Sequence, residues 1–244
     1  MKILSKLNES LKSNIWLFKG FLFSIIYYVV AVMLYHVVAE IHIQEPKTLF
    51  SPIDYLIPFI PFFVIFYVFI FYPFVIFTLG YFLFYRTGRT NQFFTALMIV
   101  YAISYITYII FPVMMIRPSP EELPNDFLSK VMAKYYELDP PLNCFPSLHA
   151  ANSTLAAYFL SKEKKDYSIL WWFIAFMVIL STLFVRQHVI ADEIAGFLVA
   201  YFAGYLAERK IPTSKDVGNK KIRMIIFVVL ATLISLFEVL SYIP

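Results

Sequence analysis

The chain has 244 residues, of which 61% are hydrophobic, 20% aromatic and only 15% charged. With a mean hydropathy of +0.73, this composition excludes a water-soluble globular protein and predicts an all-α, polytopic membrane helical bundle solvated by membrane lipids. The formal net charge of +4 does not indicate a nucleic-acid partner, because membrane topology explains where the basic residues lie. A single cysteine excludes an internal disulfide.

Apolar runs recur along the whole chain. A bilayer core about 30 Å thick needs roughly 20 apolar residues in a helix. We expect seven spans in a single integral membrane domain covering residues 1–244, with six helices forming a core and a seventh added to it. The fourth span rises only about 22 Å, so we expect it to begin below the membrane surface. The predicted spans are Ile15–Val38, Ile57–Phe84, Phe93–Pro112, Pro146–Leu160, Ser168–Val185, Val189–Ala207 and Ile222–Ile243.

The loops between these spans differ in charge. Lys and Arg collect in loops on the cytoplasmic side of a membrane. We therefore expect a multi-pass protein of the cell membrane, with a cytoplasmic amino terminus and with the external loop 113–145 on the outer face. This loop is over 30 residues long, enough to act as a lid or as a wall of a site. The basic segments are the amino terminus, Arg86–Arg89, Lys162–Lys165 and Arg209–Arg223.

Ionisable residues at membrane depth are costly, and they usually indicate a function. Arg117, His149, Arg186, His188 and Asp192 all fall at the outer ends of predicted spans. The topology brings residues spread over some 75 positions to one level of the membrane. We expect them to converge on one site near the outer face.

His188 and Asp192 are four residues apart, which places them on one face of a helix. Asp192 can then accept the Nδ1 proton of His188 and leave Nε2 free as a nucleophile or base. The alternative is a histidine that caps a helix with an acid in its first turn.

His149 follows Pro146, a residue suited to the first position of a helix. Free N–H groups at such a helix start attract an anion such as phosphate, and Ser147 adds a hydroxyl donor. The helix dipole makes a histidine here a stronger acid, which suits protonation of a leaving oxygen. The alternative is Ser147 as an ordinary N-terminal cap.

Two arginines complete the candidate site. Arg117 and Arg186 supply planar cations for phosphoryl oxygens, and together with two imidazoles they suit phosphoryl transfer. Arg186 meets the ligand of His188 only if the chain turns between them, and the alternative is an interfacial anchor. Zinc is a rival use of these residues, as is Cys144 acting as nucleophile with His149 as base. We expect no metal and no cofactor, because the chain has no H-E-x-x-H motif or paired cysteines and guanidinium groups repel a cation.

Three separated motifs resemble the signature of the type-2 phosphatidic acid phosphatase superfamily, which is K-x6-R-P, then P-S-G-H, then S-R-x5-H-x3-D. Their order is the same, and the resemblance runs over residues 93–207, the predicted catalytic core. It implies a phosphohistidine intermediate without metal. The matching residues are Arg117 and Pro118, then Pro146, Ser147 and His149, then Ser181, His188 and Asp192.

The resemblance also implies a role for each residue. In the superfamily the third-motif histidine attacks phosphorus and the aspartate orients it, which assigns these roles to His188 and Asp192. The second-motif histidine protonates the leaving group, which assigns that role to His149.

This chain departs from the signature at three positions. Ile110 replaces the lysine, so one cation is missing, and Leu148 replaces the small glycine. Thr182 replaces the arginine. Because Arg186 follows Thr182 by four residues, on the same helical face, we expect Arg186 to supply that guanidinium.

We therefore predict an integral membrane phosphatase that acts on lipid phosphate or pyrophosphate esters. A phosphotransferase that moves a phosphoryl headgroup to a polyol or another lipid is the first alternative. The stretch F-P-S-L-H-A is similar to the branch with the inositol phosphoryltransferases of sphingolipid synthesis. A non-catalytic lipid-phosphate binder is the second alternative, and it would not need the H-x-x-x-D pair.

Overall fold

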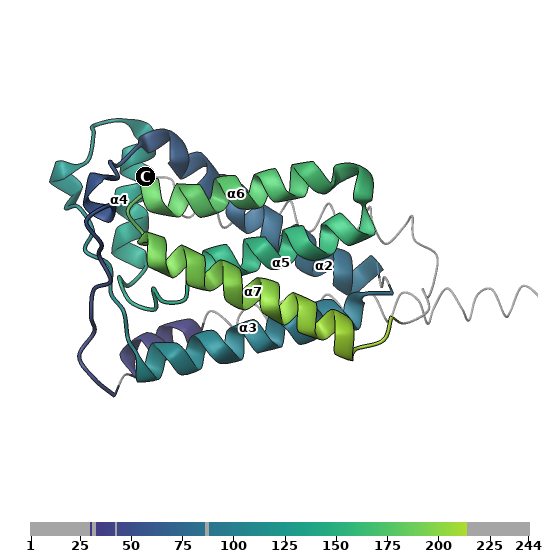
Figure 1. Ribbon diagram of the computed structural model, residues 1–244. Coiled ribbons are helices and arrows are strands. Elements are labelled where there is room, and N and C mark those ends of the chain that lie inside the picture. Colours follow the sequence, from purple (N-terminus) through teal and green to yellow (C-terminus); the bar gives the residue numbers. More distant parts are fainter. Residues whose placement is uncertain (1–29, 31–32, 42, 86–87, 214–244) are drawn as a thin grey trace, which may run out of the picture.

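The computed structural model describes residues 30, 33–41, 43–85 and 88–213. All regular elements in this part of the chain are helices, which confirms the predicted all-α fold. Figure 1 shows the long helices side by side along one axis. The predicted span Ile222–Ile243, and most of Ile15–Val38, lie outside the described residues.

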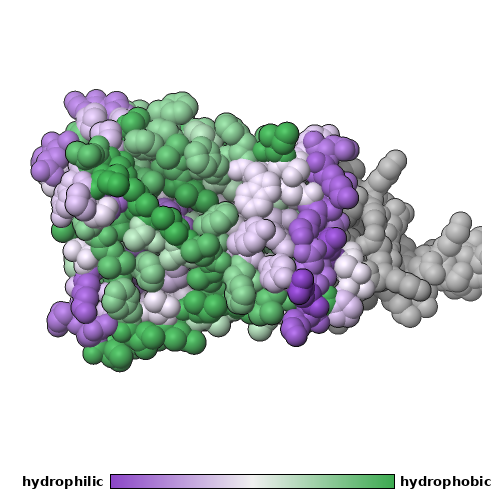
Figure 2. Space-filling view, viewed as in Figure 1, coloured by the Kyte–Doolittle hydropathy of each residue, from purple (hydrophilic) through white to green (hydrophobic). Residues whose placement is uncertain are grey.

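Four of the described helices are long and apolar enough to cross a membrane. They coincide with the second, third, fifth and sixth predicted spans. Their outer faces carry large apolar side chains such as Ile169 and Met98, which are 87% and 70% exposed. In Figure 2 this apolar surface forms a band with hydrophilic residues at both ends. The four helices are Pro61–Leu83, Thr90–Ile110, Lys165–Phe184 and Ile190–Lys210.

The fourth predicted span forms the centre of the bundle. It is α5 (Leu148–Glu163), whose 16 residues are too few for a full membrane crossing. Every residue from Ala150 to Ser161 is buried, because this helix is surrounded by its neighbours. The helices packed around α5 are α2 (Phe71–Tyr85), α3 (Thr90–Ile110), α6 (Ser168–Phe184) and α7 (Ile190–Lys210), and η5 (Lys165–Tyr167) precedes α6.

The second predicted span begins irregularly. Three short elements precede α2: η1 (Asp54–Leu56), η2 (Pro61–Phe63) and a π-helical segment, η3 (Ile65–Ile70). Proline suits the first position of η2, because its missing N–H needs no helical partner there. π-Helical turns are rare and occur frequently at functional sites.

The external loop forms one end of the bundle. It contains η4 (Pro120–Glu122) and α4 (Phe127–Leu138), and Figure 1 shows α4 beyond the ends of the long helices. Asp126 caps α4, since its side chain accepts a hydrogen bond from Ser129 N at 3.0 Å. The buried face of α4 packs on a cluster that ties the loop to η3 and to the residue after α6. This cluster contains Val64, Tyr67, Val68, Val131, Met132, Tyr135 and Val185.

A glycine lets α7 approach the start of α5. A Cβ atom at Gly196 would lie 2.3 Å from the carbonyl oxygen of Ser147 and 3.0 Å from Ala150 Cβ. At the same contact, Ser147 N donates to Asp192 O at 3.0 Å. Because Gly196 has no side chain, the second and third motifs can approach each other this closely.

Candidate active site

The chain turns sharply between α6 and α7, as the topology required. Gln187 N donates to Thr182 O at 2.9 Å and Arg186 N donates to Leu183 O at 3.1 Å, with Arg186 at φ 55°. These two bonds around a left-handed residue form a Schellman motif, which usually has glycine at this position. His188 consequently lies in the turn, before α7. The expectation that His188 and Asp192 share a helical face is wrong in this detail.

The predicted contact between His188 and Asp192 is nevertheless present. His188 Nδ1 lies 3.2 Å from Asp192 Oδ2, and the same oxygen accepts a hydrogen bond from Val189 N at 3.1 Å. Asp192 is 1% exposed and occupies the first turn of α7. One carboxylate thus both orients the imidazole and caps the helix. The alternative of a capping histidine is wrong, because Asp192 and not His188 accepts the Val189 N–H.

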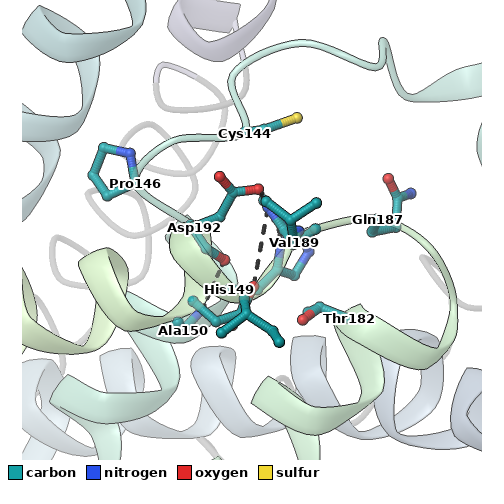
Figure 3. A network of polar contacts seen from close by, with 12 residues as sticks. Cys144, Pro146, His149, Ala150, Thr182, Gln187, Val189 and Asp192 are labelled. Atoms are coloured by element: carbon teal, nitrogen blue, oxygen red, sulfur yellow. Dashed lines mark hydrogen bonds and ion pairs between the residues drawn. The ribbon is translucent and has the colours of Figure 1, made fainter. Parts of the chain in front are cut away.

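The two histidines meet although 39 positions separate them. His149 Nδ1 lies 3.3 Å from His188 Nε2, the nitrogen that Asp192 leaves free. The His149 ring also packs on the aromatic rings of Tyr67 and Phe71, with centroid separations of 4.8 and 4.5 Å. Figure 3 labels His149, Val189 and Asp192 among the residues of this polar network. The π-helical segment thus supports the ring that we expect to act as acid.

Ser147 caps the helix that carries His149. Its Oγ accepts a hydrogen bond from Ala150 N at 3.2 Å, so α5 begins at Leu148. Pro146 therefore precedes the cap and does not take the first helical position, which corrects the sequence expectation. Ser147 is fully buried, and a role of its hydroxyl in phosphate binding stays a prediction.

Arg117 reaches the site from the external loop. Its guanidinium forms an ion pair with Asp139 at 2.9 Å, donates to the backbone oxygen of that residue, and hydrogen-bonds to Gln187 Oε1. Two buried donors here, Arg117 Nε and Gln187 Nε2, have no hydrogen-bond partner among the described residues. Because unpaired buried donors are costly, these N–H groups are suited to receive an anionic ligand.

Arg186 points elsewhere. Its Nη1 donates to the backbone oxygens of Asp54 and Ile57, each at 2.9 Å, and its guanidinium lies over the Phe50 ring. These contacts hold the turn against η1, and they explain how a non-glycine residue is kept in the left-handed region. These contacts do not support the expectation that Arg186 takes the place of the arginine missing at Thr182. A role of Arg186 in phosphate binding stays a prediction.

Asp54 fixes the other side of the turn. Its Oδ1 accepts a hydrogen bond from Ile190 N at 2.9 Å, and its Oδ2 accepts bonds from the N and Oγ of Ser51. Burial alone would raise the pKa of this carboxyl, but the hydrogen bonds from Ile190 and Ser51 outweigh it, so the pKa is lowered. An ionised carboxylate thus caps α7 from a segment 136 residues away.

The surroundings of His188 favour its protonated form. Burial lowers its pKa, but the hydrogen bond to Asp192 and the charges of Glu193, Asp192 and Asp139 raise it, and the net change is upward. His188 itself is 7% exposed. A positive charge that develops on this ring during a reaction is therefore stabilised on the Nδ1 side.

Cys144 lies beside this pair. Its Sγ, a His188 ring nitrogen and an Asp192 carboxylate oxygen are within 4.8 Å of one another. Burial raises the pKa of the Cys144 thiol well above its usual value, and the Asp192 charge adds to the effect, so the thiolate that a metal needs is disfavoured. Since His188 and Asp192 are already hydrogen-bonded to each other, we assign no metal to this group.

Several site residues lie outside every motif that the sequence revealed. Gln187 lies between Arg186 and His188, and Glu193 follows Asp192, but no motif position marks either residue. Tyr67 belongs to the predicted span Ile57–Phe84, in which the sequence indicated an apolar helix alone, and Asp54 lies just before that span. Each of these residues is a polar group inside an apolar run or at its end. The sequence shows that feature, but it does not show which other side chain the polar group contacts.

Comparison with known proteins gives one match. The family model described as the PAP2 superfamily matches residues 93–216. No curated protein and no solved structure matches the chain. The matched region contains both histidines, Asp192 and the external loop, but not η1 or the π-helical segment.

Proposed function

Because the chain belongs to the PAP2 superfamily, whose members are generally phosphatases or phosphotransferases acting on phosphate esters, we propose that it hydrolyses lipid phosphate or pyrophosphate esters through a phosphohistidine on His188. One observation carries this proposal. Two imidazoles from distant segments face each other at 3.3 Å, and a carboxylate holds the far nitrogen of one of them. This arrangement supplies a nucleophile, its orienting group and a proton donor.

The residues suit two successive steps. His188 Nε2 attacks phosphorus, the bond from phosphorus to the leaving oxygen breaks, and His149 donates a proton to that oxygen. Water then attacks the phosphohistidine, with His149 taking its proton, and inorganic phosphate leaves. The entering phosphoryl group replaces the contact between the two rings, and Asp192 keeps the proton of His188 on Nδ1 throughout.

Arg117 is the cation best placed to hold the phosphoryl oxygens. Its Asp139 and Gln187 contacts fix the guanidinium, and the free Nε and Gln187 Nε2 donors offer hydrogen bonds to an anion. Preorganised donors of this kind stabilise charge that develops in a transition state. The missing lysine at Ile110 leaves this clamp with fewer charges than the superfamily signature.

The lipid nature of the substrate and its side of the membrane belong to the same proposal. The site lies at the end of the bundle closed by α4, next to the apolar band of Figure 2, where a lipid headgroup meets water. Arg89, Lys162 and Arg209 flank the opposite ends of the helices, and basic residues favour the cytoplasm. Both features support an active site at the outer face of the cell membrane.

The test uses the full-length protein in detergent with a panel of lipid phosphates and pyrophosphates, with and without added polyols. Release of inorganic phosphate supports hydrolysis. Headgroup exchange onto a polyol without phosphate release would instead identify a phosphotransferase. Acid-labile, base-stable labelling of wild-type protein by a radioactive substrate, absent from His188→Gln, would report the phosphohistidine.

A matched pair of variants separates catalysis from binding. His188→Asn should lower turnover by about 10⁴-fold, as loss of an essential catalytic residue does. A non-catalytic binder would retain its affinity for lipid phosphate in this variant and show no turnover in the wild type. Trp172→Phe, on α6 away from the histidines, controls for handling of the protein and should behave as wild type.

A further inference from the structure

Glu193 is a buried carboxylate that the superfamily signature does not use. It follows Asp192 in the first turn of α7 and is 3% exposed. Neither of its carboxylate oxygens has a hydrogen-bond partner among the described residues. Burying a carboxylate without a hydrogen-bond partner destabilises a protein, so its presence here requires a reason.

The carboxylate of Glu193 faces the nucleophile. Its Oε1 lies 4.0 Å from His188 Nδ1, on the side where Asp192 Oδ2 lies at 3.2 Å. The hydroxyls of Ser147 and Thr182 are near this carboxylate; Thr182 donates to Ile179 O at 2.7 Å, whereas Ser147 Oγ accepts a bond from Ala150 N and keeps its own proton for a neighbour. Two carboxylates therefore lie near Nδ1 of His188, and Nε2 is the ring nitrogen that would attack phosphorus.

We propose that Glu193 is a positioning residue that acts as a second counter-charge to His188, stabilising the positive ring that forms when His188 attacks phosphorus. This inference rests on the proposed function. As the Nε2–P bond forms, the ring gains positive charge, and its Nδ1–H strengthens its interactions with both carboxylates. Asp192 supplies the hydrogen bond and Glu193 supplies a second charge at longer range.

Other charged side chains near the histidines already have partners of their own. The Asp139 carboxylate is paired with Arg117, and the Arg186 guanidinium is bonded to backbone oxygens of the η1 region. Burial lowers the pKa of His188, and among the causes that raise it Glu193 comes after the hydrogen bond that the ring donates to Asp192. The titratable or charged groups around the two histidines are Asp192 and Glu193 on α7, Tyr67 of the π-helical segment, and Arg117, Asp139 and Cys144 of the external loop.

The first measurement is the pKa of His188 itself, which needs no substrate. Full-length protein with ¹⁵N-labelled histidine is titrated by NMR in detergent, and the signal is assigned by its loss in His188→Gln. Glu193→Gln should lower the pKa of His188 by about one unit, because one nearby negative charge is removed. Glu193→Asp, which keeps the charge, should restore most of the shift. An unchanged pKa in Glu193→Gln overturns the proposal, whatever happens to turnover.

The second measurement is the rate profile. Glu193→Gln should lower kcat about tenfold without raising KM, since the carboxylate does not contact substrate, and should move the acidic limb of kcat/KM to lower pH. A merely structural role would lower the folded fraction and leave the limb in place, which also overturns the proposal. If Glu193→Gln lowers the pKa of His188 but the wild-type protein releases no phosphate, the proposed function fails, while the interaction between Glu193 and His188 is still supported.

A matched control lies on the same helix. Glu208, near the other end of α7, is paired with Arg89 at 2.8 Å and with Lys162. Glu208→Gln makes the same chemical change far from the histidines. It should leave the pKa of His188 and the acidic limb unchanged, and an equal shift in this variant would assign the effect to overall charge.

Discussion

The two ends of α7 hold their glutamates in opposite ways. Glu208 has every oxygen paired: Oε1 with Arg89 Nη1 at 2.8 Å, and Oε2 with Tyr158 OH at 2.7 Å and with Lys162. Its side chain is 28% exposed, whereas the side chain of Glu193 is 4% exposed and has no hydrogen bond among the described residues. The Glu208 network pairs its charges with one another, whereas the site end keeps some buried donors and acceptors, including Arg117 Nε and both Glu193 oxygens, without a partner among the described residues.

This difference separates stability from function within one helix. Partly exposed ion pairs contribute only about 0–1 kcal/mol each to stability. The network at Glu208 therefore neutralises its charges and adds a modest amount to the stability of this end of the bundle. Unpaired buried groups at the site destabilise the free protein, and a bound phosphoryl group would satisfy the donors. Substitutions of the unpaired groups at the site should therefore change kinetics, whereas substitutions in the Glu208 network should change stability and leave kinetics unaltered.

Among substitutions that leave His188 intact, the largest effect should come from Gly196→Ala. The new Cβ would lie 2.3 Å from Ser147 O, a backbone atom that cannot move without displacing the start of α5. A displacement of about 1 Å at the histidines lowers turnover about 10²-fold. Phosphate-release assays should show this loss.

Gly204→Ala is its control at the opposite end of α7. There the new Cβ would meet the Tyr158 ring at 3.1 Å, a side chain that can shift. This variant should change thermal stability more than kcat. Equal losses of turnover in both variants would contradict the distinction between the two ends.

Arg117→Lys should have the next largest effect. Lysine keeps the charge but loses the planar fork that bonds Asp139 and Gln187, so we expect kcat/KM to fall by about 10- to 100-fold. Arg186→Lys tests the other arginine under the same assay. Because Arg186 contacts the backbone of the η1 region, this variant should lower stability with a smaller kinetic loss. A larger kinetic loss at Arg186 would support its role as a phosphate ligand.

Asp54→Asn should give a moderate effect that depends on pH. The substitution removes the charge that caps α7, so we expect a loss of about 1 kcal/mol in the free energy of unfolding near neutral pH. Since the folded pKa of Asp54 is lowered, its contribution is present above the unfolded value and is lost as pH falls through the folded pKa. Thermal unfolding of the two proteins should therefore differ at pH 7 and converge in acid. A difference that grows in acid would contradict this assignment.

Lys162→Met should have the smallest effect. It removes one partner of Glu208 while Arg89 and Tyr158 remain. We expect a change of at most about 1 kcal/mol in stability and none in kcat, KM or the pH profile. A kinetic change would show that the two ends are coupled through α7.

The sequence predicted the helical fold because apolar runs of span length leave few alternatives in a membrane. It also placed His149, His188 and Asp192 at one level, because each ends a span on the same side. The third-motif spacing then gave the contact between His188 and Asp192 correctly. These features depend on local composition and on the length of a helix, which can be counted along the chain.

The direction of side chains at helix ends was not predictable in the same way. Arg186 adopts a left-handed conformation in the turn, and this single rotation directs its guanidinium to Asp54 and Ile57. His188 precedes α7 for the same reason. A spacing of four residues describes a shared face only inside a continuous helix.

By itself, the sequence determined that this is a helical membrane protein with two histidines and an aspartate gathered at one end, because hydrophobic length and span order fix the level of each residue. Only the tertiary structure decided which groups meet there. Asp54 caps α7 from 136 positions away, Tyr67 supports His149 from a π-helical turn, and Glu193 faces His188 from α7. Contacts of this kind depend on packing between segments distant in the chain, and no local pattern of residues specifies them.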